Sequence, residues 1–435
     1  MKLVIIAGGK GTRLGLKDIP KPMVNINFKP LLEYQIILAK KYNIKEIYIL
    51  SGYLSGVITD YFGDGSKWGV KIKHIIENTP LGTAGALKQL EFELKDRFMV
   101  FYGDTIMDIN LEDFIEFDTK NYHSIGSIMV HPNDHPDDSD LLEIDNDNKV
   151  VVFHSKPHNK SIYYTNLVNA ALYILSPKVF KYIETNKMLD FGKDIFPKLI
   201  QSKNLFAYKT TEYLKDMGTI DRLKKVEQDL LSGKVKRLNK TYKQKCIFLD
   251  RDGVINKEID NLVNIEEFNL IQGVPEAIKK LNESEYIAII VTNQPVIAKG
   301  FIGEIKLNQI HKKMDTNLGK NGAYIDDLYY CPHHPQKGFI GEVKELKINC
   351  ECRKPKSGML KMAAEDYNID LKKSWIIGDR YADIKAGNKE GCQTILLKTG
   401  HAGNDKNNYK NLEADFIFNT LNDAVDCILN NKEKV

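Results

Sequence analysis

The sequence predicts an α/β protein made of two successive Rossmann-like domains. At 435 residues the chain is too long for a single hydrophobic core. Short apolar runs alternate with amphipathic stretches up to about residue 225, which is typical of layered sheets and helices. The same alternation restarts at Cys246. We therefore expect a first domain over residues 1–225, a linker over 226–245 and a second domain over 246–435.

Composition excludes several classes of protein. Apolar residues make up 43% of the chain and charged residues 28%, as in ordinary globular proteins. The net charge of +4 is too small to indicate a nucleic-acid partner. No apolar stretch approaches the roughly 20 residues that cross a bilayer, and Leu3–Ala7 is too short for a signal peptide. We expect a cytoplasmic protein that acts on small molecules, whose oligomeric state the sequence leaves open.

The first domain contains the expected strands and helices in alternation. Strands are predicted at Lys2–Ala7, Glu46–Leu50, Lys71–Ile76, Phe98–Tyr102, Ile125–Val130 and Ala170–Leu175, and helices at Pro30–Tyr42 and Leu81–Leu90. His131–Asp140, with two prolines and four aspartates, is predicted to be an exposed loop. Lys224–Lys245 is lysine-rich, and we expect a helix followed by the linker.

The second domain repeats this pattern. Strands are predicted from Cys246, at Ile287–Thr292, near Asp327–Tyr330, at Ser374–Ile377 and at Thr394–Leu397, with helices near Pro275–Asn282 and Ile305–Leu318. Cys246, Cys392 and Cys427 are scattered in apolar surroundings and are expected to be buried structural thiols.

A glycine-rich turn follows the first strand. Gly8, Gly9 and Gly11 let backbone N–H groups approach phosphate oxygens closely, and Arg13 adds a bidentate partner. Lys21 stands between two prolines further on. The turn has neither the Walker spacing nor the G-x-G-x-x-G order of a dinucleotide site. It indicates a phosphate site of another kind.

Two aspartates strengthen this indication. Asp104 follows a buried strand, where ligands collect in open α/β sheets, and Asp216 precedes a predicted helix. Either one alone fits a helix cap or a turn. Together with the glycine turn they would hold Mg²⁺ against a nucleoside triphosphate.

Five motifs in this domain occur together: A-G-G-K-G-T-R-L, P-K-P-M, P-L-G-T-A-G-A, F-Y-G-D and D-M-G-T. By these the chain to about Lys225 resembles the sugar-1-phosphate nucleotidyltransferases, which have a GT-A-like fold. The resemblance implies that the triphosphate, base and ribose are bound by Gly8, Gly9, Gly11, Thr12, Arg13, Gly82 and Gly85, with Lys21 near the α-phosphate and Asp104 and Asp216 on Mg²⁺. H-S-K-P replaces the usual E-K-P, and N-A-A replaces N-A-G. Lys156 and Asn169 are therefore looser matches for sugar contacts.

This chemistry does not require a nucleophilic side chain. A sugar-1-phosphate oxygen is already anionic at pH 7 and can attack the α-phosphorus directly. Alignment and charge neutralisation are then the protein's tasks, by Mg²⁺, Arg13 and Lys21. The products would be a nucleotide-sugar and pyrophosphate.

Polar residues follow three strands of the second domain. Asp250 and Asp252 end the first strand, Thr292 and Asn293 end the next, and Asp379, followed by Arg380 and Asp383, ends a later one. Arg353 and Lys354 add two cations. An isolated D-x-D-G would fit a tight turn, but the full set resembles the haloacid dehalogenase phosphatases.

That resemblance assigns roles to these residues. It implies Asp250 as the nucleophile and Asp252 as general acid and then base, with Mg²⁺ held by Asp250, Asp252 and Asp379. Phosphoryl and substrate contacts would come from Thr292, Asn293, Arg353, Lys354 and Arg380, with Asp383 in support.

Cys331-x-His333 and Cys350-x-Cys352 form a Cys₃His set suited to structural zinc. His334 is the alternative ligand, and unrelated thiols beside a turn histidine are the non-metal interpretation. The zinc loop narrows the resemblance to two capless groups, the heptose 1,7-bisphosphate phosphatases and the histidinol-phosphate phosphatases. By likeness to these, Glu258 to Asn261 would lie on the substrate loop.

The presence of both domains in one chain favours one pair of activities. Removing the 7-phosphate of D-glycero-D-manno-heptose 1,7-bisphosphate yields a sugar 1-phosphate, which the first domain could activate with GTP to give GDP-D-glycero-α-D-manno-heptose. One alternative is a hexose-1-phosphate nucleotidyltransferase fused to a histidinol-phosphate phosphatase. Another has one half as a non-catalytic nucleotide-sensing or scaffold module.

Overall fold

The computed structural model describes residues 1–435 except 10, 12–14, 16–17 and 431–435. The chain divides into two compact units. The first comprises 1–131, 139–157 and 167–239, and the second comprises 132–138, 158–166 and 240–435. Among the described residues, none of the helices is both long and apolar enough to cross a membrane.

The first unit is built on a mixed sheet. Its strands are β1 (Lys2–Ile6), β4 (Glu46–Ser51), β5 (Lys71–Ile76), β6 (Phe98–Tyr102), β8 (Gly126–His131), β9 (Leu141–Ile144), β10 (Val150–His154), β11 (Val168–Leu175) and β12 (Leu205–Lys209). The order is β10-β9-β11-β6-β1-β4-β5, with β8 paired to β11 and β12. The central strand β1 runs parallel to β4 and β6, whereas β11 is antiparallel to β6. All six strands predicted in this domain are confirmed.

Two small sheets complete the strands of this unit. They pair β2 (Asn25–Ile26) with β3 (Lys29–Pro30) and β7 (Thr105–Asp108) with β13 (Tyr213–Asp216). The helices are α1 (Leu31–Lys41), α2 (Ser55–Phe62), α3 (Gly82–Gly85), α4 (Leu111–Lys120), α5 (Phe196–Gln201), α6 (Ile220–Leu231) and α7 (Lys234–Arg237). The helix predicted over 81–90 is a single α-turn that continues as a 3-10 helix over Ala86–Leu90.

The prediction of an exposed loop over His131–Asp140 is wrong. Strand β8 extends to His131, and Pro136–Asp138 form a 3-10 turn. Asn133, Pro136 and Ser139 are buried. The Asn133 amide N–H donates to Asn166 Oδ1, and the Asn166 amide donates to the Asn133 carbonyl oxygen. Prolines and aspartates predict a turn, but they do not reveal which segments cover it.

The second unit is a parallel sheet with helices on both faces. Its strands are β14 (Lys245–Leu249), β15 (Tyr286–Asn293), β16 (Asp327–Cys331), β17 (Trp375–Gly378), β18 (Gln393–Leu397) and β19 (Phe416–Phe418), in the order β16-β15-β14-β17-β18-β19. The helices are α8 (Val274–Glu283), α9 (Glu304–Gly319), α10 (Gly358–Tyr367), α11 (Tyr381–Glu390) and α12 (Leu421–Asn430). The strands and helices predicted here are confirmed.

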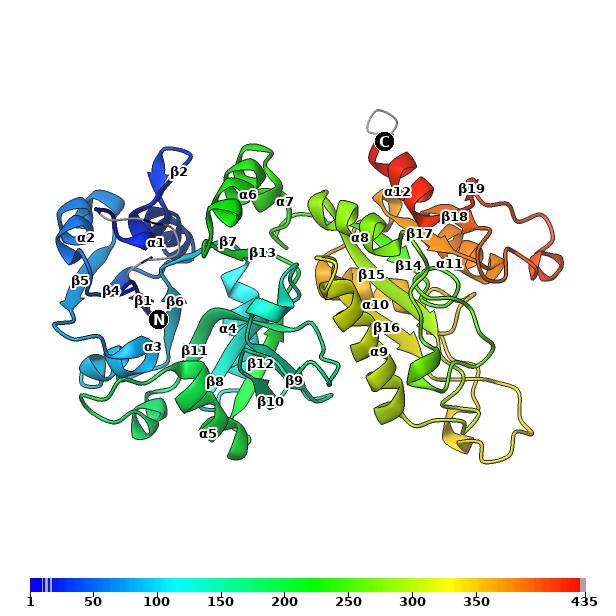
Figure 1. Ribbon diagram of the computed structural model, residues 1–435, viewed down its shortest axis with the longest axis horizontal. Coiled ribbons are helices and arrows are strands. Elements are labelled where there is room, and N and C mark those ends of the chain that lie inside the picture. The colour runs from blue at the N-terminus through cyan, green and yellow to red at the C-terminus, as the bar shows by residue number, and fades with distance from the viewer. Residues whose placement is uncertain (10, 12–14, 16–17, 431–435) are drawn as a thin grey trace. The chain divides into compact units, whose positions relative to one another are not determined.

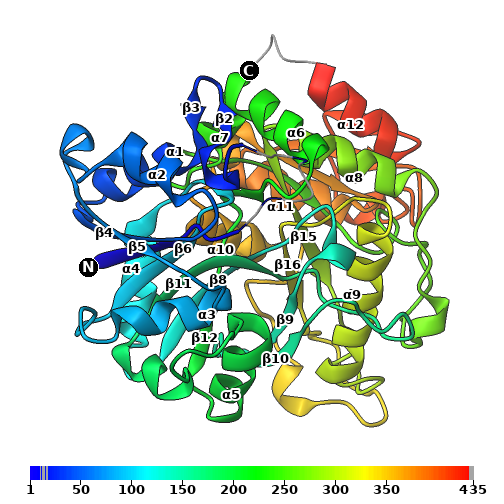
Figure 2. The same cartoon turned by 60° about the vertical axis from the view of Figure 1, so that its left-hand side comes forward.

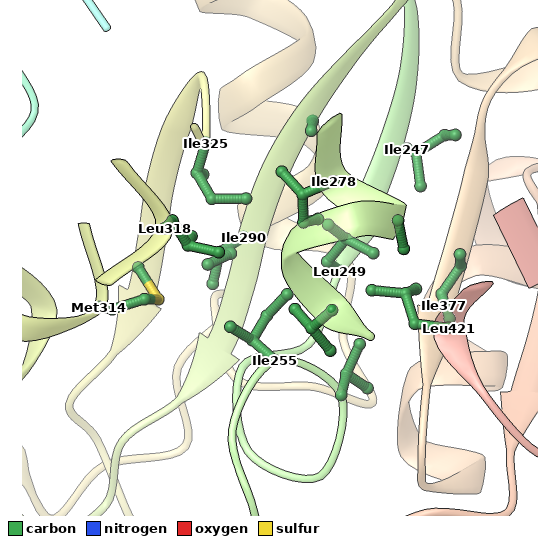
Figure 3. Packing of buried hydrophobic residues seen from close by; sticks show 14 of the residues in the cluster. Ile247, Leu249, Ile255, Ile278, Ile290, Met314, Leu318, Ile325, Ile377 and Leu421 are labelled. Atoms are coloured by element: carbon green, nitrogen blue, oxygen red, sulfur yellow. The ribbon is translucent and has the colours of Figure 1, made fainter. Parts of the chain in front are cut away.

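Burial on both faces explains why the inner strands β14, β15, β17 and β18 are mostly apolar. Ile247 and Leu249 point toward the side of the sheet covered by α8, where Ile278 packs on them (Figure 3). The alternate residue Phe248 is fully buried on the other side. Helices α8 and α12 lie side by side, and Lys280 Nζ of α8 is 2.6 Å from Asp426 Oδ1 of α12 (Figure 2).

The prediction that three isolated cysteines are buried is confirmed for two of them. Cys246 and Cys392 are buried, whereas Cys427 on α12 is half-buried. The segment before the second unit contains α6 and α7, and the division between units falls between Asn239 and Lys240.

Candidate active sites

The second sheet places its polar strand ends together. Because β14, β15 and β17 are parallel, the residues that follow them meet at one edge, from which the loops after β15 and β16 extend (Figure 1). A pocket of about 450 Å³ opens at this edge. Its lining includes the predicted residues Asp250, Asp252, Glu258, Asn261, Thr292, Asn293, Arg353, Lys354, Asp379, Arg380 and Asp383.

Lys354 is the cation nearest to the predicted nucleophile. Its Nζ lies 2.8 Å from Asp250 Oδ2 and 2.5 Å from Asp383 Oδ1, and its side chain is only 1% exposed. Asn293 fixes the Lys354 backbone, donating from Nδ2 to its carbonyl oxygen and accepting from its N–H, both at 3.0 Å. The attraction of two carboxylates outweighs burial and raises the pKa of Lys354. A permanent positive charge thus faces Asp250.

Asp379 completes a group of carboxylates that fits a divalent cation. Oxygen atoms of Asp250, Asp379 and Asp383 lie within 4.8 Å of one another. Burial, followed by the charges of Asp250 and Asp383, raises the pKa of Asp379 to about 8. Its Oδ1 is buried without a hydrogen-bond partner among the described residues. A hard cation such as Mg²⁺ would relieve this repulsion and use the unsatisfied oxygen.

The carboxylate of Asp252 is not a member of that group. It accepts hydrogen bonds from Arg251 Nη2 at 2.9 Å, Asn256 Nδ2 at 2.9 Å and Gln294 Nε2 at 2.7 Å. Burial opposes ionisation, but the Arg251 guanidinium and these hydrogen bonds lower the pKa of Asp252. An ionised carboxylate can take a proton from water, and it donates one only after that uptake. The ionised Asp252 carboxylate is therefore suited to act as the general base.

Glu258 and Arg380 meet a histidine that the sequence motifs do not indicate. His401 Nε2 lies 3.5 Å from Glu258 Oε1 and also contacts Arg380, while the His401 N–H donates to Asp379 Oδ2 at 2.6 Å. Burial, followed by the Asp252 charge, raises the pKa of Glu258 to about 7. His401 lies beyond the last recognisable motif, so only the fold could reveal it.

The four predicted zinc ligands converge. Cys331, Cys350 and Cys352 Sγ and His333 Nδ1 are separated from one another by 3.2 to 3.6 Å where contacts are resolved. Zn–S bonds of about 2.3 Å require tetrahedral donors roughly 3.8 Å apart, so a small expansion accommodates zinc. The thiols are free, and their separations far exceed a disulfide bond of about 2.05 Å.

The loop that carries the four predicted zinc ligands also contributes residues to the pocket. Arg353 directly follows Cys352 and donates from Nη1 to the His333 carbonyl oxygen at 3.3 Å. His334 is not in the four-residue cluster and lines the pocket instead.

In the first unit, Lys21 and Asp104 form the centre of the predicted nucleotide site. Lys21 is buried, and its Nζ lies 2.5 Å from Asp104 Oδ2. Gly11 approaches Lys21 so closely that an added Cβ would lie 3.1 Å from Lys21 Cβ. The predicted phosphate ligands Thr12 and Arg13 lie outside the described residues.

The two predicted magnesium ligands of this unit are on paired segments. Asp216 of β13 is in register with Thr105 of β7, directly after Asp104, and the Met217 N–H donates to the Asp104 carbonyl oxygen. The Asp216 carboxylate pairs with Arg222 at 2.9 Å. The side chains of Asp104 and Asp216 are 35% and 38% exposed. A cation that carries phosphate ligands can therefore reach both carboxylates.

Gly82 and Gly85 have a packing role. A Cβ on Gly82 would lie 2.4 Å from the Leu189 carbonyl oxygen, and one on Gly85 would lie 2.3 Å from that of Lys187. Gly82 also has φ +73°. The absence of a side chain at Gly82 and Gly85 lets residues 187–189 pack directly on this turn.

The two looser sugar-side matches lie near one aspartate. The Lys156 N–H donates to Asp140 Oδ1 at 3.2 Å, and the Asn169 N–H donates to the Asp140 carbonyl oxygen at 3.0 Å. Asn169 Oδ1 accepts from the Ala171 N–H. The fold thus brings Lys156, which follows β10, and Asn169 of β11 to one region.

Glu77, which the motifs do not single out, faces the glycine turn. It follows β5, and a Cβ on Gly8 would lie 3.2 Å from its Oε1. Its Oε2 accepts from the Leu81 N–H at 3.1 Å. Burial raises the pKa of Glu77, and among the described residues no cation pairs with it. This half-buried carboxylate has one oxygen available to a ligand.

Comparisons with known proteins assign a family to each half of the chain. Residues 2–233 match the Nucleotidyl transferase family, and residues 351–424 match a HAD-hydrolase-like family. A D-glycero-β-D-manno-heptose-1,7-bisphosphate 7-phosphatase from Haemophilus ducreyi is 38% identical over 184 residues, covering 42% of this chain and 97% of that protein. The α-anomer 7-phosphatase of Photorhabdus laumondii is 41% identical, covering 37% and 85% respectively.

The chain therefore belongs to the nucleotidyl transferase family through its first half and to the heptose-bisphosphate phosphatase family through its second. Both predicted resemblances are confirmed. Among solved structures, HddC from Yersinia pseudotuberculosis is 31% identical, covering 53% of this chain and 99% of that one with a TM-score of 0.46. The D,D-heptose 1,7-bisphosphate phosphatase of B. bronchiseptica, complexed with magnesium and phosphate, is 31% identical, covering 43% and 99% with a TM-score of 0.38.

Proposed function

We propose that this chain is a bifunctional enzyme that produces a nucleotide-activated heptose. The second half removes the 7-phosphate of D-glycero-D-manno-heptose 1,7-bisphosphate. The first half transfers GMP from GTP to the resulting heptose 1-phosphate, giving GDP-D-glycero-α-D-manno-heptose and pyrophosphate. The observation that carries the proposal is that a heptose-bisphosphate phosphatase and a nucleotidyltransferase share one chain. The product of the former is the kind of substrate that the latter uses.

In the phosphatase half, the Asp250 carboxylate attacks the 7-phosphorus and forms an aspartyl-phosphate while the sugar oxygen leaves. Asp252 handles the protons of the leaving oxygen and of the water that hydrolyses the intermediate. Lys354 neutralises phosphoryl charge beside the nucleophile. Bound Mg²⁺, held by Asp250 and Asp379 and by Asp252 or Asp383, would add positive charge at the phosphate.

In the nucleotidyltransferase half, an oxygen of the heptose 1-phosphate attacks the α-phosphorus of GTP, and pyrophosphate leaves. Lys21 supplies a buried positive charge next to Asp104. Mg²⁺ on Asp104 and Asp216 would neutralise the triphosphate.

Glu77 supports guanine as the base. Its carboxylate lies beside Gly8 and just ahead of Gly82, which the family resemblance assigns to the base and ribose. Guanine carries two adjacent donors, N1–H and the N2 amino group, and a carboxylate is their natural bidentate acceptor. Uracil and thymine offer a single donor on the corresponding edge.

Phosphate release from purified protein tests the phosphatase half. Both anomers of the heptose 1,7-bisphosphate and histidinol phosphate are compared at equal concentrations with Mg²⁺. Relatives of both anomeric types match, so the preferred anomer is an outcome of this assay. Faster release from histidinol phosphate would favour the alternative fusion with a hexose-1-phosphate nucleotidyltransferase. No release from any of them would favour a non-catalytic module.

A further inference from the structure

Arg251, which stands between the two motif aspartates of the second half, has a fully buried side chain. A guanidinium keeps its charge on burial, so it must be paired and hydrogen-bonded inside the protein. Two side chains meet this need, Asp252 at one end of the guanidinium and His311 at the other. The sequence motifs assign no role to Arg251 or to His311.

Arg251 holds both oxygens of the Asp252 carboxylate. Its Nη2 lies 2.9 Å from Oδ1 and 2.9 Å from Oδ2, and its Nε lies 3.2 Å from Oδ1. A planar guanidinium set against a planar carboxylate fixes the orientation of that carboxylate as well as its position. Asn256 donates to Oδ1 and Gln294 donates to Oδ2, so three side chains hold Asp252.

His311 of α9 fixes the other end of the guanidinium. Arg251 Nη1 donates to His311 Nε2 at 3.1 Å. Because arginine has donors only, this nitrogen accepts, which requires the neutral ring. Burial, followed by the Arg251 charge, lowers the pKa of His311 to about 3, in agreement with a neutral ring. The ring packs against Tyr330 of β16 with its centroid 5.8 Å away, so the acceptor is itself held in place.

The backbone of Arg251 connects this arrangement to the predicted nucleophile. Its N–H donates to Asp250 Oδ1 at 2.7 Å, while Lys354 Nζ lies 2.8 Å from Oδ2. One residue therefore contacts the two carboxylates that act in succession, Asp250 through its backbone and Asp252 through its side chain.

We propose that Arg251 and His311 are positioning residues that aim the Asp252 carboxylate during hydrolysis of the aspartyl-phosphate. This inference rests on the proposed phosphatase mechanism. In that step a water oxygen bonds to phosphorus, and the bond from phosphorus to the Asp250 oxygen breaks with its electron pair returning to the carboxylate. The water proton passes to Asp252, so an Asp252 oxygen must point at that water.

p-Nitrophenyl phosphate separates this step from the one before it, because p-nitrophenolate leaves without taking a proton. Rapid mixing with Mg²⁺ present measures the burst of p-nitrophenolate, and a chase measures the decay of the aspartyl-phosphate. In Arg251→Lys, which keeps the charge but loses the fork, and in His311→Leu we expect the decay to slow at least about tenfold. A displacement of about 1 Å can cost on the order of 100-fold. The burst rate should change by less than about twofold.

Two further variants serve as rescue and control. His311→Gln supplies an amide oxygen that can accept from Arg251, and it should return the decay to within about threefold of the wild type. Gln309→Leu, at an exposed residue of the same helix, should leave both steps unchanged. Should Arg251→Lys fail to fold, His311→Leu and its rescue decide the question, because the His311 ring is half-buried and uncharged.

Equal slowing of the burst and the decay would mean that these residues support the fold or the nucleophile, and an unchanged decay would equally overturn the inference. p-Nitrophenyl phosphate contains no sugar, so the result is independent of the proposed heptose substrate. Failure to hydrolyse heptose 1,7-bisphosphate would count against the proposed function alone. A wild-type protein that forms no aspartyl-phosphate would overturn the mechanism and this inference together.

Discussion

At the scale of single residues, the carboxylates around Asp379 make the metal site sensitive to pH. Asp379 is buried beside Asp250 and Asp383, and its pKa is raised to about 8. The folded metal-free protein therefore binds a proton that the unfolded chain releases above its ordinary pKa near 4. Its stability should fall as pH rises from about 4 toward 8.

Addition of Mg²⁺ should reverse this trend, because the cation replaces the proton among the carboxylates. We expect a larger increase in Tm on adding Mg²⁺ at pH 8 than at pH 5, measured by thermal unfolding against the same zinc-containing protein without Mg²⁺. Asp379→Asn should reduce the difference between the two pH values. Equal increases in the wild-type protein would contradict the assignment of Asp379.

Glu77 leads to a prediction about nucleotide choice. Glu77→Gln replaces one acceptor oxygen with an amide donor, which opposes the N1–H or amino group of guanine. We expect kcat/KM for GTP to fall about 10- to 100-fold relative to UTP, since a bidentate base contact is worth roughly 1–3 kcal/mol. Parallel assays of nucleotide-sugar formation with each nucleotide measure this ratio. Glu116→Gln, at an exposed residue of α4, is the control, and an unchanged ratio would rule Glu77 out.

Some site residues could be predicted from sequence and others could not. Asp250 and Asp379 belong to short motifs at strand ends, and parallel strands bring such ends together, whereas Lys354 belongs to the Arg-Lys-Pro motif of the loop after β16. Glu77 and His401 stand outside any motif. They join their sites because β5 ends beside the glycine turn and because the loop after β18 meets Asp379.

At the scale of elements, we expect the loop that carries Cys331, His333, Cys350 and Cys352 to link metal binding to phosphatase activity. Cys350→Ser removes one ligand of the cluster, so we expect loss of bound zinc and displacement of Arg353 and Lys354. Phosphate release should fall at least about tenfold, while nucleotidyl transfer should stay within about twofold of the wild type. Zinc content is measured by atomic emission alongside the two assays.

The matched control for this prediction is Cys427→Ser, at a half-buried thiol outside the cluster. It should retain zinc and both activities. Full phosphatase activity in zinc-free Cys350→Ser protein would show that the loop does not depend on the metal.

Sequence periodicity was sufficient for most elements, because apolar strands buried on both faces leave little choice of structure. It was insufficient where another segment decides the conformation. The turn at Gly82 and Gly85 is shaped by the chain at Lys187 and Leu189, and the segment around Asn133 is buried by hydrogen bonds with Asn166. Such partners lie tens of residues away and leave no local pattern.

At the scale of the whole molecule, each half has its own sheet, core and candidate site. This organisation implies that the two reactions can be separated by single substitutions. Asp250 is the proposed nucleophile of one site, and Asp104 is a proposed magnesium ligand of the other.

The central claim is that one chain converts heptose 1,7-bisphosphate into GDP-heptose in two steps. The direct measurement is chromatography and mass spectrometry of the products formed from the bisphosphate, GTP and Mg²⁺. Wild-type protein should give phosphate, pyrophosphate and GDP-heptose. Asp250→Asn should give GDP-heptose only when heptose 1-phosphate is supplied, and Asp104→Asn should stop at heptose 1-phosphate. Release of phosphate by the wild type without GDP-heptose, even when heptose 1-phosphate and GTP are in excess, would contradict the account.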